Sequence, residues 1–532
     1  MDRPGRLVLP RVEPRPAGRL RGRRRARGPR EDVVRRAARG SAVVVLNWRD
    51  RRHPAAGGAE LYCQRVAREL AGRGRSVVLV TSRPAGTAAR ESLDGYSVRR
   101  MGSWWSVYPL ALLWLVRHRS SIGQVVDSQN GIPFFSPLVV GRRTPVVLLV
   151  HHVHQDRFAR ALHPLAARLA RWLEGPASRR AYRHRTVVVL SPSARTQVRR
   201  RLRFDGAISV VPTGADTFGV RSERSATPRV VVVGRLAADK RLGSLVDAMA
   251  EVQRRLPDAE LHLVGEGPVR RELEQRVEAA GARVVFHGHL PDTERDALLG
   301  TAWLTVSASD GGDWAVSLVE ANAAGVPAVA RRVSGLRDTV RHGETGWLVD
   351  GPGDGLAEVI TRALLTLADP VVAGVVGARA RAWAARFTWA RTADGVQQAL
   401  DAEQVRLERR LRGERERRTG NDLVVVLSAA RSALPADWPS SRRAGDVWVS
   451  DGTTVRALLA GADEGDVEAV LARLGIRRDD PSISVLVARH ADLLGGRHLL
   501  DEPGVELVEV AGHPTAALGN QRPDGRGRRH AA

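Results

Sequence analysis

The chain has 532 residues, with 84 basic and 58 acidic side chains, a formal charge of +26 and a hydrophobic content of 43%. This length and composition indicate a globular protein of several domains and exclude a wholly disordered chain. The longest apolar run, 107–116, is about half the length that a bilayer-spanning helix needs, so we expect no transmembrane helix. The lone cysteine, Cys63, excludes an internal disulfide and a Cys-rich zinc site, and we expect a cytoplasmic protein.

Positive charge is concentrated in two segments of the chain. Residues 1–40 hold 14 Arg and 4 acidic residues, and residues 157–204 hold 13 Arg and one acidic residue, Glu174. The first segment lacks apolar periodicity and predicts a disordered Arg-rich arm. A solvated tail is the simpler interpretation of this arm, and binding to nucleic acid or anionic lipid is the alternative.

The second basic segment has apolar residues at helical spacing among its arginines, which favours a basic amphipathic helix. Packing of the apolar face on the core, with the Arg face in solvent, is the simpler interpretation. A patch that faces an anionic membrane is the alternative. The apolar residues are Leu162, Leu165, Leu169, Trp172 and Leu173.

Residues 41–220 alternate between short apolar segments and helical patterns. The apolar segments predict strands that are buried on both faces, which is typical of a parallel sheet covered by helices. The expected helix lies at 59–70, and the expected strands lie at 42–46, 77–81, 98–101, 125–127, 146–150, 187–190 and 208–211.

Residues 221–385 repeat this alternation and predict a second parallel α/β domain. We therefore expect two doubly wound, Rossmann-like domains that face each other across a cleft. The expected strands are 230–233, 260–264, 284–287, 304–307 and 327–330, and the expected helices are 242–255, 268–280, 292–300 and 315–324.

The C-terminal part begins with 401–419, which consists almost entirely of charged helix formers and predicts a linker helix. Residues 420–515 predict a small α/β domain of unassigned role, and 516–532 a disordered Gly/Arg-rich tail. Within the small domain we expect strands at 423–427, 484–488 and 505–510 and helices near 454–460 and 465–474.

A Gly-Gly-Ala-Glu motif, from Gly57 to Glu60, follows the first strand and opens a helix. Two glycines there allow a close backbone approach, and the free N–H groups of a helix N-terminus favour an anion. An ordinary strand-to-helix turn is the alternative. The motif does not match G-x-G-x-x-G, which argues against a dinucleotide-dependent oxidoreductase.

A second motif places Gly234, Arg235 and Lys240 in the loop after strand 230–233. Ligands of open α/β sheets bind at this end of the strands, and two cations there would neutralise a diphosphate. Solvated loop cations are the alternative. Lys240 is the only lysine among the 84 basic residues, and an ammonium is a compact point charge that a planar guanidinium does not replace.

A third motif is a Gly-rich loop from Asp310 that leads into a helix carrying Glu320. The helix N-terminus could hold a phosphate, and the Glu320 carboxylate could accept hydrogen bonds from a sugar diol. A carboxylate stabilised by the helix dipole is the alternative interpretation.

These motifs, followed by Gly335-Leu336-Arg337-Asp338 and Gly343-Glu344-Thr345-Gly346, resemble glycosyltransferase family 4 over roughly 41–400. The resemblance implies a GT-B fold and a retaining glycosyltransferase that uses a nucleotide sugar. It also implies that Phe387-Thr388-Trp389 opens a terminal helix, 386–400, that packs back on the first domain.

The same resemblance assigns roles to residues of the second domain. Arg235 and Lys240 would bind the donor diphosphate in the loop that Gly234 opens, and stabilise the leaving group. Glu320 would hold the ribose hydroxyls. The loop of His287, Gly288 and His289 would contact the nucleobase through its backbone.

In the first domain the resemblance implies that Gly58 lies beneath the transferred sugar, and Gly57 is assigned to the donor site with it. His151 follows strand 146–150 and matches a family histidine near the donor sugar. Three histidines within 151–154 could also suggest a metal site. The resemblance implies no metal and no cofactor beyond the donor substrate, and the Asp-x-Asp triplet of the metal-dependent GT-A enzymes is absent from the sequence.

One position departs from the family pattern, in which a first Glu precedes the Glu at position 320 with seven residues between them. That first position is Gly312, and the following turn holds Trp314 and Ala315 where the family has an aromatic residue and Gly. Asp310 or Asp313 could replace the missing carboxylate after a shift of the loop. Contacts to the donor sugar are therefore assigned to Asp313, Trp314 and Ala315 as a group.

We therefore expect a retaining hexosyltransferase that uses a nucleotide-diphosphate sugar, with a lipid-linked or cell-envelope glycan as a candidate acceptor. The alternatives are a catalytically weakened basic scaffold that binds nucleic acid or an anionic surface, and a GT-B nucleotide-sugar epimerase. The near-neutral remainder of the chain disfavours nucleic acid as a partner. The basic segment 157–204 suggests a peripheral position at the inner face of the cell membrane.

Overall fold

The computed structural model describes residues 41–54, 56–216, 223–311, 314–350 and 355–412, and shorter stretches beyond them. The arm 1–40 and the tail 516–532 lie outside the described residues, as does 413–419. The further stretches are 423–434, 447–450, 452–460, 462, 464–476, 480, 482–489 and 506–508.

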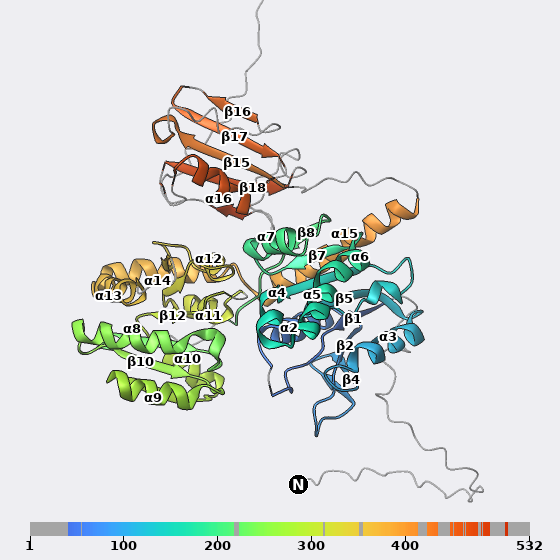
Figure 1. The fold of residues 1–532 in the computed structure, drawn as a ribbon, viewed down its shortest axis with the longest axis horizontal. Coiled ribbons are helices and arrows are strands. Elements are labelled where there is room, and N and C mark those ends of the chain that lie inside the picture. The colour runs from blue at the N-terminus through green and yellow to red at the C-terminus, as the bar shows by residue number, and fades with distance from the viewer. Residues whose placement is uncertain are drawn as a thin grey trace, which may run out of the picture.

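The first domain is built on an eight-stranded sheet, and all neighbouring strands are parallel except the β3–β4 pair (Figure 1). The predicted strands are all present, with ends shifted by up to three residues. In sheet order the strands are β3 (Arg90–Leu93), β4 (Tyr96–Arg100), β2 (Val77–Thr81), β1 (Ala42–Leu46), β5 (Ile122–Asn130), β6 (Val146–His152), β7 (Thr186–Val189) and β8 (Ile208–Val210).

Helices cover both faces of this sheet. Alternate residues of β1 enter opposite cores: Val43 and Val45 pack with one layer, and Val44 and Leu46 with the other. This explains why the strand sequences are apolar without alternation. The helices are α2 (Gly58–Gly72), α3 (Val107–His118), α4 (Gln155–Ala161), α5 (Pro164–Trp172), α6 (Ser178–Tyr182) and α7 (Pro192–Arg201), with a π-helical turn at Leu173–Ala177.

The second domain is also a parallel sheet between helices. Two three-stranded ladders are joined by a parallel bridge between Val230 and Leu304, which gives the order β11-β10-β9-β12-β13-β14. The strands are β9 (Arg229–Val233), β10 (Glu260–Val264), β11 (Val284–Gly288), β12 (Thr305–Ser307), β13 (Ala328–Arg331) and β14 (Gly346–Val349). The helices are α8 (Leu242–Arg255), α9 (Arg270–Ala280), α10 (Asp292–Gly300), α11 (Val316–Ala324), α12 (Leu336–Thr339), α13 (Gly355–Leu367) and α14 (Pro370–Ala384).

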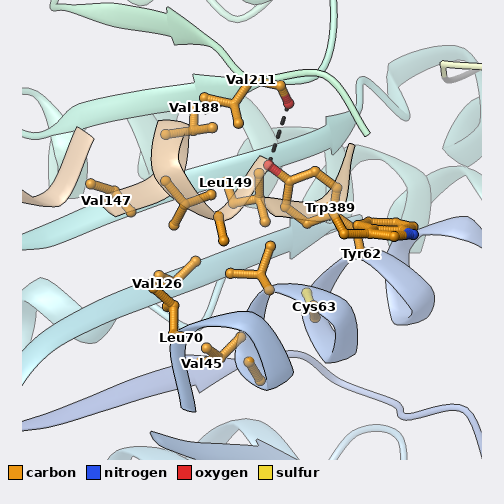
Figure 2. Packing of buried hydrophobic residues seen from close by; sticks show 14 of the residues in the cluster. Val45, Tyr62, Cys63, Leu70, Val126, Val147, Leu149, Val188, Val211 and Trp389 are labelled. Atoms are coloured by element: carbon orange, nitrogen blue, oxygen red, sulfur yellow. Dashed lines mark hydrogen bonds between the residues drawn. The ribbon is translucent and has the colours of Figure 1, made fainter. Parts of the chain in front are cut away.

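After the second domain the chain returns to the first through α15 (Trp389–Leu411). Thr388 caps this helix by accepting from the backbone N–H of Arg391. Figure 2 shows Trp389 beside Tyr62 of α2, and their rings meet edge to face 6.5 Å apart within the first-domain core. The terminal helix and the start of the expected linker helix are therefore one helix, because apolar residues continue to face the core as far as Leu407.

In its described residues the C-terminal unit is an antiparallel five-stranded sheet with one α-helix, α16 (Glu464–Arg473), and not a continuation of the parallel α/β pattern. The expected helix near 454–460 is wrong, because this segment is strand β17. Its residues Val455, Ala457 and Leu459 alternate into the core. In sheet order the strands are β16 (Val447–Ser450), β17 (Thr454–Ala460), β15 (Leu423–Ala430), β18 (Ile483–Arg489) and β19 (Glu506–Val508).

The basic segment of the first domain forms α4, α5, α6 and α7. The expectation that its apolar residues pack on the core is wrong for four of the five, which are exposed: Leu162, Leu165, Leu169 and Trp172. Among the described residues, no single helix is long and apolar enough to span a membrane. Two consecutive helical segments, Gly355–Leu367 and Pro370–Leu411, together have the length and composition of a membrane span, but they are bent by 110° at the break between them.

Candidate active site

The Gly-Gly-Ala-Glu motif opens α2 at the carboxyl end of β1, as the sequence predicted. The buried Glu60 carboxylate accepts from the Gly57 backbone N–H at 2.6 Å and from Arg49 Nε at 2.7 Å. Asn130, at the end of β5, donates to the same carboxylate at 3.3 Å. Glu60 therefore fixes the loop before α2, while Gly58 is exposed and a Cβ there would meet no atom within 4 Å.

His151 lies at the carboxyl end of β6 and is buried. Its Nε2 is 2.9 Å from the Ser128 hydroxyl of β5, and its ring meets Tyr62 edge to face at 5.5 Å. The Cys63 thiol is 3.8 Å from the same nitrogen, and burial raises the pKa of this thiol to about 12. Cys63 is therefore a buried neutral thiol, and His151 is held in a fixed orientation.

The loop that carries Arg235 and Lys240 follows β9, at the carboxyl edge of the second sheet. Backbone hydrogen bonds join it to the loop after β10: Gly234 N–H donates to Val264 O at 2.9 Å, and Leu236 N–H to Glu266 O at 3.0 Å. The contact is so close that a Cβ at Gly267 would lie 2.0 Å from Leu236 O. Sequence reasoning did not use Gly265 and Gly267, although a Gly-x-Gly after strand 260–264 was a signal for such an approach.

The cations of this loop, Arg235 and Lys240, are exposed, and the loop meets the first domain through Asp239. Asp239, between them, lies 3.9 Å from Arg235 and accepts from Arg157 of α4 at 3.0 Å. Among the described residues, none forms an ion pair with the Lys240 ammonium. The loop therefore presents at least one uncompensated positive charge at the boundary between the domains.

The loop after β12 contacts Arg241, the residue that follows Lys240. Asp310 forms an ion pair with Arg241 at 3.0 Å and lies 3.8 Å from Arg331. Asp310 is thus engaged by two arginines, whereas Gly312 and Asp313 lie outside the described residues.

Trp314 and Ala315 stand at the start of α11. Trp314 is buried, meets Phe387 edge to face at 4.8 Å and packs in the core of the first domain. Its indole Nε1 has no hydrogen-bond partner among the described residues. A buried N–H without a partner is costly, so this atom is a candidate contact for a ligand.

Glu320 lies on α11 beside α10 and is partly buried. Burial raises the pKa of Glu320 to about 7; Arg295 opposes this rise, and Asp216 reinforces it. No described residue forms a hydrogen bond or ion pair with the Glu320 carboxylate, so its acceptor oxygens remain available to a diol.

His287, on β11, is paired with a neighbour. Its Nε2 lies 2.9 Å from His262 Nδ1 of β10, the two rings stack, and burial lowers the pKa of both. The backbone of Gly288 accepts from Gly265 N–H at 2.7 Å. The structure therefore brings the backbone of this loop, rather than the His287 ring, next to the loops after β9 and β10.

A pocket lies between the two domains and brings His151 and Trp314 together. Beside it, the Ser193 hydroxyl of α7 donates to Asp338 and accepts from the Gly335 N–H at 2.9 Å. These bonds join the start of α7 to the start of α12 across the domain boundary. The pocket is lined by Val150, His151, His152, Val153, Leu190, Ser191, Ala194, Gln197, Val198, Trp314 and Ser334.

The three histidines of 151–154 do not converge. His154 Nδ1 lies 3.1 Å from the His152 carbonyl, and its ring stacks on Phe158, whereas His151 faces Ser128. Within the part of the chain that the structure describes, no group of three or more His, Cys, Asp or Glu residues could hold a metal ion.

Comparison with known proteins agrees with this architecture. The family described as Glycosyltransferase Family 4 matches residues 56–217, and the family described as Glycosyl transferases group 1 matches residues 217–368. A GDP-mannose-dependent alpha-(1-6)-phosphatidylinositol monomannoside mannosyltransferase of Mycolicibacterium smegmatis is 30% identical over 295 residues, which cover 52% of this chain and 69% of the relative. The chain is a GT-B glycosyltransferase of the family 4 type.

Other relatives of this glycosyltransferase differ in their substrates. The alpha-D-kanosaminyltransferase of Streptomyces kanamyceticus is 27% identical over 286 residues, which cover 48% of this chain and 72% of the relative. Among solved structures, sucrose-phosphate synthase from Thermosynechococcus elongatus superposes with a TM-score of 0.55 at 21% identity, covering 70% of this chain and all of that one. WaaG, a glycosyltransferase of lipopolysaccharide biosynthesis, gives 0.53 at 18% identity, with 68% and 99% covered. These two structures share the GT-B fold with this glycosyltransferase.

Proposed function

We propose that this glycosyltransferase moves a hexose from a nucleotide-diphosphate sugar to an acceptor hydroxyl and retains the α configuration. The observation that carries the proposal is the loop after β9, which exposes Arg235 and Lys240 and meets the first domain through the Arg157–Asp239 pair. A leaving nucleoside diphosphate gains negative charge as its bond to the sugar breaks. Fixed cations at that place stabilise the transition state more than the bound substrate.

Retention follows from attack on the face that the phosphate leaves. The bond between the anomeric carbon and the phosphate oxygen breaks, the bond to the acceptor oxygen forms, and the acceptor proton passes to the departing phosphate. Among the described residues that line the pocket there is no carboxylate to act as a nucleophile. This supports attack by the acceptor on the same face as the departing phosphate, without a covalent sugar–enzyme intermediate, which depends on positioning and charge.

The remaining site residues bind the donor in this proposal. Gly57 and Gly58 leave the N-terminus of α2 open to the sugar, and His151 borders the sugar pocket. Trp314 offers its indole N–H to a sugar hydroxyl. Glu320 accepts from the ribose diol, and Ala315 lies beside the sugar; the assignment of Asp313 to the donor sugar stays a prediction from the sequence.

The acceptor is proposed at the level of its class, as a hydroxyl of a lipid-linked or envelope glycan. The name of the Mycolicibacterium relative specifies a phosphatidylinositol acceptor, which supports this choice. We further propose a cytoplasmic enzyme, because its one cysteine is a buried free thiol. In this proposal Arg235 and Lys240 supply the positive charge that a metal ion supplies in metal-dependent GT-A enzymes. Chelation of metal ions with EDTA should therefore leave the transfer rate unchanged.

Two measurements test the proposed reaction. A thermal-shift screen against UDP- and GDP-hexoses identifies the donor, since a ligand that binds only the native state raises the unfolding temperature. NMR of the product then gives the anomeric configuration, and a β product from an α donor would reject retention. Incubation without an acceptor separates the epimerase alternative, which would change the sugar of the donor itself.

A further inference from the structure

Helix α5 is attached to the protein by very little of its surface. Ala167 is the only buried residue of this nine-residue helix. Three large apolar side chains stand in solvent: Leu165 is 72% exposed, Leu169 58% and Trp172 54%. Soluble proteins rarely leave adjacent large apolar side chains uncovered without a binding role.

The three exposed side chains form one stripe. Positions 165, 169 and 172 are spaced i, i+4 and i+7, so at about 100° per residue they lie on one side of the helix. Ala167 lies roughly opposite to them on the same helical wheel. The helix therefore contacts the protein through its small residue and turns its apolar stripe away from it.

The surroundings of the stripe are positively charged. Arg168 lies beside it on α5, Arg160 and Arg171 are exposed on the same segment, and no ion pair joins Arg160 or Arg168 to a described residue. Asp156 is the single acidic residue of 155–173, and it is paired with Arg201 at 2.6 Å. The next acidic residue, Glu174, is fully buried in the π-helical turn and accepts from Gln155 Nε2 at 2.7 Å.

This surface lies beside the active site. Helix α4 begins three residues after β6, the strand that carries His151, and Arg157 of α4 contacts Asp239 in the donor loop. A ligand bound at α4 and α5 would therefore be presented close to the opening of the pocket.

We propose that the surface formed by residues 155–173, the α4–α5 surface, docks on an anionic phospholipid bilayer. Leu165, Leu169 and Trp172 enter the headgroup boundary, and the arginines bind lipid phosphates. A second copy of the chain is a poorer occupant, because an isologous contact would set two positively charged surfaces against each other. The proposal goes beyond the transfer reaction, since it assigns a separate docking surface. Docking would hold the enzyme at the bilayer surface, where a lipid-linked acceptor is concentrated.

The test is co-sedimentation of the full chain with phosphatidylcholine vesicles that contain or lack phosphatidylglycerol. The stripe variant is Leu165→Gln/Leu169→Gln/Trp172→Gln, and the charge variant is Arg160→Gln/Arg168→Gln/Arg171→Gln. The matched control is Leu365→Gln, because Leu365 on α13 is similarly exposed, at 57%. The thermal shift with the donor shows that each variant is folded, independently of vesicle binding.

We expect wild type and Leu365→Gln to bind the anionic vesicles at low salt and to be released at high salt. Both triple variants should lose at least tenfold in vesicle partition while keeping their donor-induced shift. Equal binding of wild type and both triple variants would overturn the proposal, since another basic segment would then be responsible. The proposal would also be overturned if wild type did not bind the vesicles but self-associated, and the stripe variant did not self-associate.

Discussion

Arg157 of the first domain donates to Asp239 of the second at 3.0 Å, and so neutralises the only carboxylate between Arg235 and Lys240. Both partners are partly exposed, so the pair itself contributes less than about 1 kcal/mol to stability. Its consequence lies in the charge of the donor loop, because an unpaired Asp239 is free to compete with the diphosphate for Arg235.

Arg157→Ala should therefore raise the KM for the donor several-fold and leave the unfolding temperature nearly unchanged. Removal of the competing carboxylate in Arg157→Ala/Asp239→Ala should restore the KM. The donor KM of wild type, of each single variant and of the double variant, measured by steady-state kinetics, completes a double-mutant cycle. If the double variant stays as impaired as Arg157→Ala, Asp239 is not the group through which Arg157 acts.

Gly267→Ala should weaken donor binding although it leaves both Arg235 and Lys240 in place. The new Cβ would lie 2.0 Å from Leu236 O, so the loop of Arg235 and Lys240 must move. The donor-induced thermal shift should fall to a small fraction of the wild-type value. Gly374→Ala on α14 is the control, since its Cβ meets no atom within 4 Å and alanine favours a helix; a comparable loss in that variant would refute the loop argument.

Glu320 should make stability depend on pH. Its pKa rises on folding from 4.5 to about 7, so the native state binds a proton that the unfolded state has released. The stability of wild type relative to Glu320→Gln should therefore fall as pH rises from 4.5 to 7, and level off above that window. Unfolding temperatures across this range measure the difference.

At pH 8, where the Glu320 carboxyl is mostly ionised, the same Glu320→Gln substitution should weaken donor binding by about tenfold, because a charged acceptor for the ribose diol is lost. Glu358→Gln is the control on α13, since Arg255 holds the pKa of that exposed carboxyl below its usual range. A Glu320→Gln variant that binds the donor as tightly as wild type would remove Glu320 from the site.

Trp389→Ala should destabilise the protein by about 3 kcal/mol or more, through the cavity left beside Tyr62. The exposed Val405, on the same helix, gives the control Val405→Ala, which should change stability by less than about 0.5 kcal/mol. Denaturant unfolding measures both. Equal stability of the two variants would show that α15 is not anchored through Trp389.

The sequence predicted the parallel strands well because their burial on both faces leaves unbroken apolar runs. It missed β3, a short edge strand whose residues Arg90 to Leu93 alternate between exposed and partly buried. It also misassigned β17, because a short apolar segment fits either a helix or a strand until its partners are known.

The motifs predicted candidate site residues, but not the contacts that these residues make. The approach of Gly267 to Leu236, the Arg157–Asp239 pair and the bonds of Ser193 each join segments far apart in sequence, which spacing does not reveal. The exposure of Leu165, Leu169 and Trp172 had the same cause, since helical periodicity identifies an apolar face without showing what covers it.

The most direct test of the account is calorimetric titration of UDP and GDP into wild type, Lys240→Ala and the control Arg362→Ala, an exposed arginine on α13 paired with Glu358. We expect wild type and Arg362→Ala to bind one nucleotide equally. Lys240→Ala should bind it at least tenfold more weakly and lose transfer while unfolding at the same temperature, because a charged contact to the diphosphate is absent. Equal affinity and equal transfer rates for Lys240→Ala and wild type would contradict the assignment of this loop as the diphosphate site.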